Sequence, residues 1–450
     1  MKTPVYFDDS LAAFLMLGES QLGSSVIDSS IFLRDASGKL TLVVPKDALG
    51  EKQREAFGVS AKKELGAYVD DAEHVTATAE ELFEEASDLQ SQARFVSTGK
   101  RRVRLIDRRA VGADWLQEPS SVTAQPPRLV FASLKGGVGR STALCVLAAH
   151  LASSGRRVLA VDMDLEAPGL GNLLLDADTL PEFGLLDFLV EHGLGNVGPE
   201  FYVDMIGPSW LGGGRGRVDV IPAIGRKSIA NPENVLAKIS RAYLSGTGFE
   251  PASNFTGHML ELLNEVAEPS RYDVVLIDAR AGLHETTGSA VIGLGADVFL
   301  FGTNQPQTIT GFKLIFAHLS TLPNREDWRG RLRVVHAKLQ PTESAEFQGQ
   351  IASLFEDYLG DKEDAFVPDL GQLKDTFDVI WDEAISDSQI DVEALEVPAP
   401  VAIVEDEKFR IFDPVKNRDY LDARFYEAAF VDFLAVATKL VDDALAGSGA

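Results

Sequence analysis

Six short apolar runs, separated by stretches with helical character, follow one another from residue 128 to residue 339. Near-continuous apolar strands that alternate with helices are typical of a parallel sheet covered on both faces. The pattern therefore predicts an α/β fold with a mostly parallel sheet and helices on both faces. The predicted strands cover residues 128–134, 157–164, 218–223, 272–279, 296–303 and 332–339, and the first helix covers residues 140–153.

Residues 1–118 have a different pattern and are predicted to form a small α+β domain. Ser30–Val44 indicates two strands around a turn, and Arg102–Ile106 indicates a third. A helix is predicted over Thr78–Phe95, because Thr78 and Glu81 have the spacing of a capping box. We find no catalytic constellation in this part of the sequence and expect an accessory or adaptor domain.

The segment 119–127 is predicted to be a linker, because it is rich in proline, serine and polar residues. A larger domain follows at residues 128–445. Within it, residues 340–410 are acidic and irregular, and we expect loops and short helices there. Residues 425–445 are amphipathic with a mostly acidic polar side, which favours a helix packed on the core over one that lies on a membrane.

The stretch SLKGGVGRST, residues 133–142, lies directly between the first predicted strand and the first helix. Its glycines let backbone N–H groups approach an anion without a Cβ in the way, and the following helix points its positive end at the same place. The hydroxyl of Ser141 is placed to bind a Mg²⁺ ion that bridges phosphates. The predicted nucleotide-binding residues are Gly136, Gly137, Val138, Gly139, Arg140, Ser141 and Thr142.

Acidic residues end two of the apolar strands. Asp162 and Asp164 end the second predicted strand, and Asp278 lies at the end of the fourth. Ligands of open α/β sheets bind at the carboxyl ends of the strands, and an acid at such a position is costly unless a cation or a helix terminus pairs with it. We interpret Asp162 and Asp278 as ligands of Mg²⁺, with helix caps or surface turns as the alternative.

The motif KGGVGRST, followed by VLAVDMDLEAPGL and VLIDARAG, resembles the deviant Walker A ATPases of the MinD/ParA group, a branch of the P-loop NTPases. The resemblance covers about residues 128–340. It implies an ATPase that binds ATP and Mg²⁺ and forms a homodimer when ATP is bound. By this resemblance Lys135 is the signature lysine, which reaches across the dimer to the nucleotide of the partner.

The resemblance also implies roles for the other matching residues. Ser141 binds Mg²⁺, Thr142 lies near the α-phosphate, and Asp278 holds Mg²⁺ through water. Asp162 lies beside Asp164, the acid of the first switch. Asp164 positions the attacking water, and Gly282 belongs to a second mobile switch. The catalytic residues implied in this way are Lys135, Arg140 and Asp164.

Arg140 departs from the family, which has a second lysine at this position. Arginine keeps the positive charge, but its planar guanidinium is larger and presents its donors in a fixed fork. Because catalysis at such sites depends on well-aimed charge, we expect retained ATP binding and slow hydrolysis. The alternative is a scaffold protein that binds nucleotide and hydrolyses none.

Three further features leave alternatives open. His336–Lys338 replaces an asparagine that the family has near the base, so His336 either contacts the base or is packed in the core. The loop Leu211–Arg217 either delivers Arg215 or Arg217 to phosphate or is a surface turn. Arg280 either senses the nucleotide or forms a salt bridge.

Composition restricts the partners and the location. The net charge is −26, which argues against direct binding to nucleic acid or to a membrane, although the basic run Lys100–Arg109 is a local exception. We therefore expect a protein partner, bound through the N-terminal domain. The single Cys145 allows no internal disulfide, which fits a cytoplasmic protein. A bacterial regulatory or anti-phage defence role follows from the resemblance alone.

Other relatives fit the sequence less well. Nitrogenase-type iron proteins need two cysteines in each subunit, and related tyrosine kinases need a C-terminal tyrosine cluster that this chain lacks. A kinase-like or ligase-like enzyme needs a further substrate pocket near residues 165–215, and the sequence shows no clear one.

Overall fold

The computed structural model describes residues 5–98, 101–109, 112–121, 123–211, 215–243, 254–323, 328–340, 344–360, 399–410, 412–413 and 416–447. The chain divides into two compact units, Met1–Ala113 and Asp114–Ala450, each with its own apolar core. The division comes before residue 118, where the sequence placed it. Asp114 accepts hydrogen bonds from the backbone and the hydroxyl of Thr256, and Trp115 is buried in the core of the second unit.

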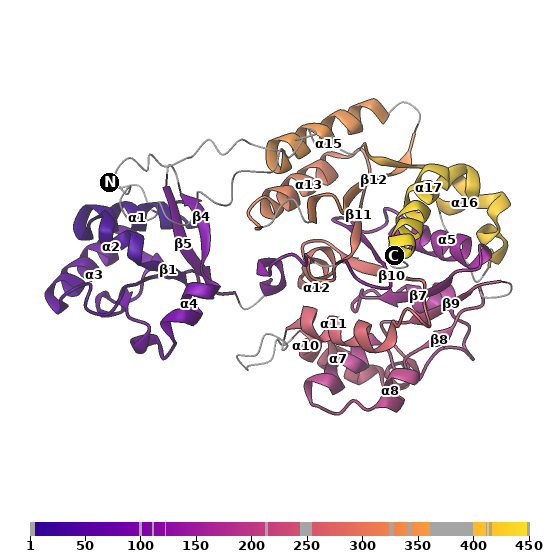
Figure 1. Ribbon diagram of the computed structural model, residues 1–450, viewed down its shortest axis with the longest axis horizontal. Helices are drawn as coiled ribbons and strands as arrows, with labels where there is room; N and C mark the ends of the chain where they lie inside the picture. Colours follow the sequence, from indigo (N-terminus) through magenta and orange to yellow (C-terminus); the bar gives the residue numbers. More distant parts are fainter. Residues whose placement is uncertain are drawn as a thin grey trace. The chain divides into compact units, whose positions relative to one another are not determined.

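The first unit is built on a five-stranded sheet with the strand order β3-β2-β1-β5-β4 (Figure 1). One face is covered by helices whose aromatic side chains pack on the strands; Phe14 and Phe57 both contribute to this core. The three strands predicted here are confirmed. The elements are α1 (Phe7–Leu22), α2 (Ser24–Ser29), β1 (Ile31–Arg34), β2 (Leu40–Val43), α3 (Glu51–Leu65), β3 (Thr76–Ala77), α4 (Ala86–Gln92), β4 (Arg94–Thr98) and β5 (Arg101–Asp107).

The continuous helix predicted over Thr78–Phe95 is wrong. A single 3₁₀ turn at Glu80–Leu82 ends at Phe83, whose φ of 57° is left-handed, and α4 begins only at Ala86. The capping box is present, because Thr78 and Glu81 each bond the backbone N–H of the other. Phe83 is 96% exposed, so its side chain contributes no burial at the point where a continuous helix would have to pass, whereas Leu89 of α4 is buried.

We predict that Thr78→Ala loosens this turn locally. Loss of a capping hydroxyl costs about 1 kcal/mol, which corresponds to about fivefold faster hydrogen exchange of the backbone amides of residues 81–84. Ser60→Ala is the control, because the Ser60 hydroxyl only bonds a carbonyl of its own helix. Equal exchange rates in wild type and Thr78→Ala would show that the cap contributes nothing.

The second unit contains an eight-stranded sheet with the order β13-β12-β11-β6-β10-β7-β9-β8. All neighbouring strands are parallel except β8 and β9, so the predicted sheet is confirmed. The strands are β6 (Arg128–Ser133), β7 (Arg157–Asp162), β8 (Gly207–Pro208), β9 (Arg217–Ile221), β10 (Val274–Ala281), β11 (Asp297–Gly302), β12 (Leu332–Leu339) and β13 (Val401–Val404).

Helices cover both faces of this sheet, as the apolar strands require (Figure 1). One face packs on α5 (Arg140–Ser153), α6 (Leu170–Leu174) and α17 (Ala423–Gly447). The other packs on α7 (Leu185–Gly193), α11 (Phe255–Val266), α13 (Pro306–Leu319) and α15 (Ser344–Leu359). Shorter helices are α8 (Pro199–Val203), α9 (Arg226–Ala230), α10 (Val235–Ala242), α12 (Glu285–Gly288) and α16 (Glu407–Arg410).

The C-terminal third differs in part from expectation. The helix predicted over residues 425–445 is confirmed by α17. Residues 340–410 are more regular than predicted, because α15 has 16 residues and β13 extends the sheet. Residues 361–398 lie outside the described part. Among the described residues, no helix combines the length and the apolarity needed to cross a membrane.

The strand order places one loop at the centre of the carboxyl edge of the sheet. From β6 the chain continues to β7 on one side, whereas β11, β12 and β13 lie on the other. A crevice forms where strand connections diverge in this way, and ligands of open α/β sheets bind there. The loop that follows β6 contains the glycine-rich motif.

Candidate functional site

The loop between β6 and α5 forms an open cradle of backbone. Gly137 has a φ of 74° and Gly139 a φ of 94°, values that L side chains rarely adopt. A Cβ built at Gly136, Gly137 or Gly139 meets nothing within 4 Å, so the glycines border open space. Helix α5 begins at Arg140 and has 14 residues. Loop amides and a helix N-terminus together form a binding site for an anion such as a phosphate.

Ser141 and Asp278 meet at one side of this cradle. The Ser141 hydroxyl donates a hydrogen bond to Oδ2 of Asp278. Oδ1 of Asp278 is buried and accepts no hydrogen bond in the described part of the chain. Burial raises the pKa of this carboxyl, against the lowering effect of Arg140 and of the Ser141 bond. An orphaned carboxylate oxygen beside a hydroxyl fits a hard cation such as Mg²⁺, or a water bound to it.

The described residues contain no group of three or more histidine, cysteine or acidic side chains that could hold a metal ion. Mg²⁺ keeps several waters and is commonly held by one or two protein groups plus substrate phosphates. Ser141 and Asp278 are therefore the residues that fit this ion.

The carboxylate of Asp162 accepts hydrogen bonds from backbone N–H groups. Its Oδ2 accepts hydrogen bonds from the backbone N–H groups of Gly169 and Leu170, and its Oδ1 accepts one from Asp164. Asp162 thus caps the start of α6 and, through the bond from the Asp164 N–H, stabilises the conformation of the loop after β7. The geometry supports the capping alternative for Asp162 and does not support a magnesium ligand at this position.

The raised pKa of the Asp162 carboxyl predicts that the stability of the protein depends on pH. Burial, with repulsion from the neighbouring Asp278, raises its pKa from 3.8 to about 7. The folded state therefore binds this proton while the unfolded state releases it, and stability falls as the pH rises from about 4 towards 7, by at most about 1.4 kcal/mol per pH unit.

Urea unfolding between pH 5 and pH 8, followed by tryptophan fluorescence, measures this slope, because Trp115 and the other tryptophans all lie in the second unit. We expect a smaller slope in Asp162→Asn than in wild type. Identical slopes in the two proteins would exclude Asp162 as the titrating group.

Arg140 lies between the two loops that flank the cradle. It is 8% exposed, donates from Nη1 to the carbonyl oxygen of Ala279, and has Nη2 3.8 Å from Oδ2 of Asp164. The other carboxylate oxygen of Asp164 accepts the N–H of Ala167 at 3.1 Å. A phosphate in the cradle therefore competes with protein groups for the donors of Arg140.

Lys135 and Thr142 lie at the two ends of the cradle. Nζ of Lys135 donates to Oε1 of Gln305 at 2.8 Å, so in the single chain this lysine contacts its own subunit. Thr142 is half-buried in the first turn of α5 and lines a small pocket together with residues at the ends of β12 and β13. Gly282 has a φ of 96°, and its N–H bonds the carbonyl of Ser133, which ties the loop after β10 to the end of β6.

The structure distinguishes between several of the open alternatives. Arg280 forms a salt bridge with Glu166, 2.5 Å long, which links the carboxyl end of β10 to the loop after β7. Arg217 pairs with Asp219 at the amino end of β9, the edge of the sheet opposite the cradle. His336 is buried and stacks on Phe347 with ring centroids 4.0 Å apart, so it is a packed core residue.

Arg215 follows residues 212–214, which lie outside the described part. Its Cβ would lie 3.8 Å from a Cβ built at Gly155, beyond the C-terminal end of α5 and away from the cradle.

Sequence reasoning missed Lys338, at the carboxyl end of β12. Its Nζ donates to the carbonyl oxygen of Gly137 at 2.7 Å, and its backbone has a left-handed φ of 56°. The sequence signal was present in the departure at His336–Lys338, but nothing in one sequence indicates a contact across 201 positions.

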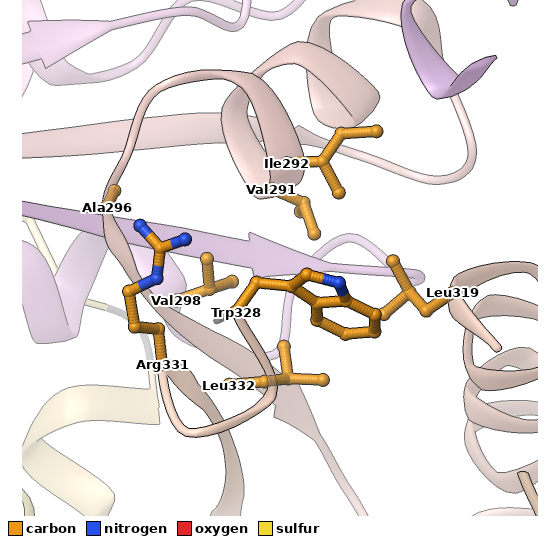
Figure 2. A pocket seen from close by; sticks show the side chains of 8 residues that line it. All are labelled: Val291, Ile292, Ala296, Val298, Leu319, Trp328, Arg331 and Leu332. Carbon is orange, nitrogen blue, oxygen red and sulfur yellow. The ribbon is translucent and has the colours of Figure 1, made fainter. Parts of the chain in front are cut away.

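A second pocket lies at the amino edge of the sheet. Figure 2 shows Trp328 beside Leu332 and Val298, with the guanidinium of Arg331 above them. Val298 and Leu332 are at the starts of β11 and β12, whereas the cradle follows the carboxyl end of β6. This apolar pocket is therefore separate from the nucleotide cradle.

Comparison with known families gives one domain match. The model of the CobQ/CobB/MinD/ParA nucleotide binding domain matches residues 129–384. No curated protein matches the chain.

Solved structures with a similar arrangement have low identity. A ParA family ATPase from Chlorobium tepidum is 15% identical, covers 69% of this chain and 99% of its own, and has a TM-score of 0.41. MinD of the MinC:MinD cell division protein complex from Aquifex aeolicus is 18% identical, covers 70% and 96%, and has a TM-score of 0.40. MinD from Pyrococcus horikoshii, complexed with Mg-ADP, is 19% identical, covers 71% and 98%, and has a TM-score of 0.40. The family of this chain therefore rests on the domain match.

Proposed function

The chain belongs to the CobQ/CobB/MinD/ParA nucleotide-binding domain family, and from this premise we propose that it is an ATP-dependent switch. ATP and Mg²⁺ bind at residues 136–142, two subunits associate in the ATP-bound state, and hydrolysis returns them to monomers. Hydrolysis is slow, because Arg140 replaces the second lysine of the motif. A protein partner recognises the associated state.

The observation that carries this proposal is the environment of Asp278. A carboxylate oxygen without a hydrogen bond is buried beside a serine hydroxyl, at the edge of a cradle of glycines. Bound Mg²⁺ would neutralise phosphate charge and orient the terminal phosphate. Ser141 would bind the ion directly, and Asp278 would hold its water shell. Asp164, held near Arg140, would orient the attacking water.

The proposed association of two subunits depends on the side chain of Lys135. Within the described residues of one chain, its ammonium donates to the neutral amide of Gln305, an exposed contact that a phosphate can replace. We propose that in the ATP-bound state it reaches the nucleotide of a second subunit.

The partner is proposed to be a protein, bound through the unit Met1–Ala113. Acidic residues outnumber Lys and Arg by 68 to 42, and the resulting field repels DNA and anionic membranes. The proposal extends to a cytoplasmic location and to a bacterial regulatory or anti-phage defence role.

Light scattering after size exclusion tests the switch. We expect a monomer with Mg-ADP and a dimer with a non-hydrolysable Mg-ATP analogue in wild type, and a monomer in both cases for Lys135→Ala. Lys313→Ala on the exposed side of α13 is the control and should dimerise like wild type. A wild type that stays monomeric with nucleotide bound would contradict the proposal.

A second candidate is a nucleotide-binding scaffold that hydrolyses no ATP. It is favoured by the two protein contacts of Arg140, to Ala279 and Asp164, which hold the guanidinium in the absence of phosphate. Steady-state turnover in the presence of the partner separates the two candidates, because only the switch releases phosphate.

A further inference from the structure

The sheet of the first unit ends in a strand with an unpaired outer edge. In the described part of the chain β4 pairs only with β5, antiparallel and in one unbroken register (Figure 1). Natural sheets shield their edges by short strands, prolines, bulges or charged side chains. The other edge strand, β3, is shielded by its length of two residues. Between Phe95 and Thr98, β4 has no proline, no charged side chain and no bulge, so this edge is open to a further strand.

The backbone groups of Phe95 and Ser97 point to this open edge. The N–H of Arg108 bonds the carbonyl of Arg34, so the even-numbered residues of β5 face β1 and the odd-numbered residues face β4. Those odd-numbered residues pair with the even-numbered residues of β4. Because the hydrogen-bonding direction alternates along a strand, the N–H and C=O groups of Phe95 and Ser97 face away from the sheet. They are the groups that an added strand would bond.

Arg102 is the arginine of the basic run that is directed to this edge. Its guanidinium carbon lies 5.3 Å from the ring centroid of Phe95, whose side chain is 60% exposed. In the described part of the chain, Arg102 contacts this aromatic face rather than a carboxylate. Other arginines of the run are bonded within the unit: Arg101 to Glu19 and Asp28, Arg104 to the carbonyl of Asp28, Arg108 to Glu84, and Arg109 to Asp107.

The occupant that fits this edge is an extended peptide with an acidic side chain. A strand added beside β4 lies about 4.8 Å further out, and Arg102 already extends across β4 to Phe95. A Glu or Asp on the same face of the added strand therefore comes within reach of the guanidinium, and an apolar neighbour covers the Phe95 ring. Nucleic acid fits less well, because phosphate binding relies on several free cations and the other arginines are already bonded.

We propose that the outer edge of β4 binds an extended acidic segment of a protein partner as an additional strand. The backbone of Phe95 and Ser97 supplies the hydrogen bonds, and Arg102 selects the acidic side chain. The proposal rests on the proposed function in one respect, that the partner binds through the unit Met1–Ala113. It adds the surface and the chemistry of the bound segment. Because these groups lie outside the nucleotide cradle, binding at this edge requires no nucleotide.

A random dodecapeptide library on phage, selected against the immobilised full chain without nucleotide, supplies the probe. We expect the selected peptides to carry at least one Asp or Glu within a run of residues of high strand propensity. The best peptide, synthesised with a fluorescent label, is then titrated with the full chain and its variants. Selected peptides rich in Lys or Arg, or no selection at all, would overturn the proposal.

Ser97→Pro tests the addition of a strand. It removes an N–H that faces the open edge and leaves the pairing with β5 in place. We expect the labelled peptide to bind at least about fivefold more weakly, the usual effect of one lost hydrogen bond. Ser97→Ala keeps the N–H and should bind like wild type. Thermal unfolding of both variants checks that the first unit stays folded.

Arg102→Glu tests the recognition of the acidic side chain independently of the proline variant. We expect it to bind the labelled peptide several-fold more weakly than wild type does. It should bind a second peptide, in which Lys replaces each Asp and Glu, more tightly than wild type does. Lys63→Glu makes the same charge change on an exposed position of α3 and should leave both affinities unchanged.

Binding at β4 and the nucleotide switch fail under different results. If the chain dimerises with the Mg-ATP analogue but binds no acidic peptide, this inference is wrong and the switch stands; if the peptide binds and no dimer forms, the reverse holds. A peptide that binds Ser97→Pro and Arg102→Glu as tightly as wild type occupies another site, which would overturn the inference. So would a single-stranded oligothymidine whose binding is weakened by Arg102→Glu and not by Ser97→Pro, because this edge would then be a nucleic-acid surface.

Discussion

Arg140→Lys is expected to raise the rate of ATP hydrolysis by about 10²–10³-fold, the usual effect of one well-aimed charged donor on a transition state. The guanidinium of Arg140 is held by the carbonyl of Ala279 and by Asp164. A lysine ammonium is smaller, can lie within the loop and can reach the bridging phosphate oxygen. Phosphate release by the purified protein, with saturating Mg-ATP, measures the change.

Arg156→Lys is the matched control for this prediction. Arg156 lies beyond the C-terminal end of α5, at the opposite end of this helix from the glycine loop, and it pairs with Asp442. The Arg156→Lys variant should therefore hydrolyse ATP at the wild-type rate. If Arg140→Lys hydrolyses ATP no faster than wild type while binding it equally well, the guanidinium is not what limits hydrolysis.

Asp278→Asn is expected to weaken the binding of Mg-ATP by about 10–100-fold, the typical cost of removing a group that orients the ligands of a metal. The free protein should be as stable as wild type or more stable, because the buried carboxylate has one oxygen without a hydrogen bond and a raised pKa. Titration calorimetry gives the affinity, and thermal unfolding of the free protein gives the stability.

Asp273→Asn should show the opposite pattern. Asp273 immediately precedes the same strand, β10, and forms a salt bridge with Arg157 at 2.7 Å, at the edge of the sheet away from the loop. Its loss should lower stability and leave Mg-ATP affinity unchanged. Equal Mg-ATP affinity in wild type and Asp278→Asn would remove Asp278 from the metal site.

The sheet of the second unit could be predicted because its strands are buried on both faces, and this leaves an unbroken apolar run in the sequence. Residues 332–339, for example, form a predicted strand and are β12 with the same limits. The loop could be predicted for a related reason. Left-handed backbone, as at Gly137 and Gly139, strongly favours glycine, so the residue type indicates the conformation.

Other features depend on contacts that one sequence does not contain. Asp162 ends a strand just as Asp278 does, but only the fold brings the N–H groups of Gly169 and Leu170 to its carboxylate. The left-handed Phe83 breaks the helix predicted over Thr78–Phe95, although the capping signal at its start is real. Lys338 reaches the phosphate loop from a distant strand.

The central claim is that the glycine loop and Asp278 together hold a magnesium nucleotide. Titration calorimetry of the full chain with ATP, in the presence of Mg²⁺ and again in the presence of EDTA, tests it most directly. We expect one ATP per chain with Mg²⁺ and clearly weaker binding when the cation is removed. No heat of binding with Mg-ATP, or an affinity that neither EDTA nor Ser141→Ala changes, would contradict it.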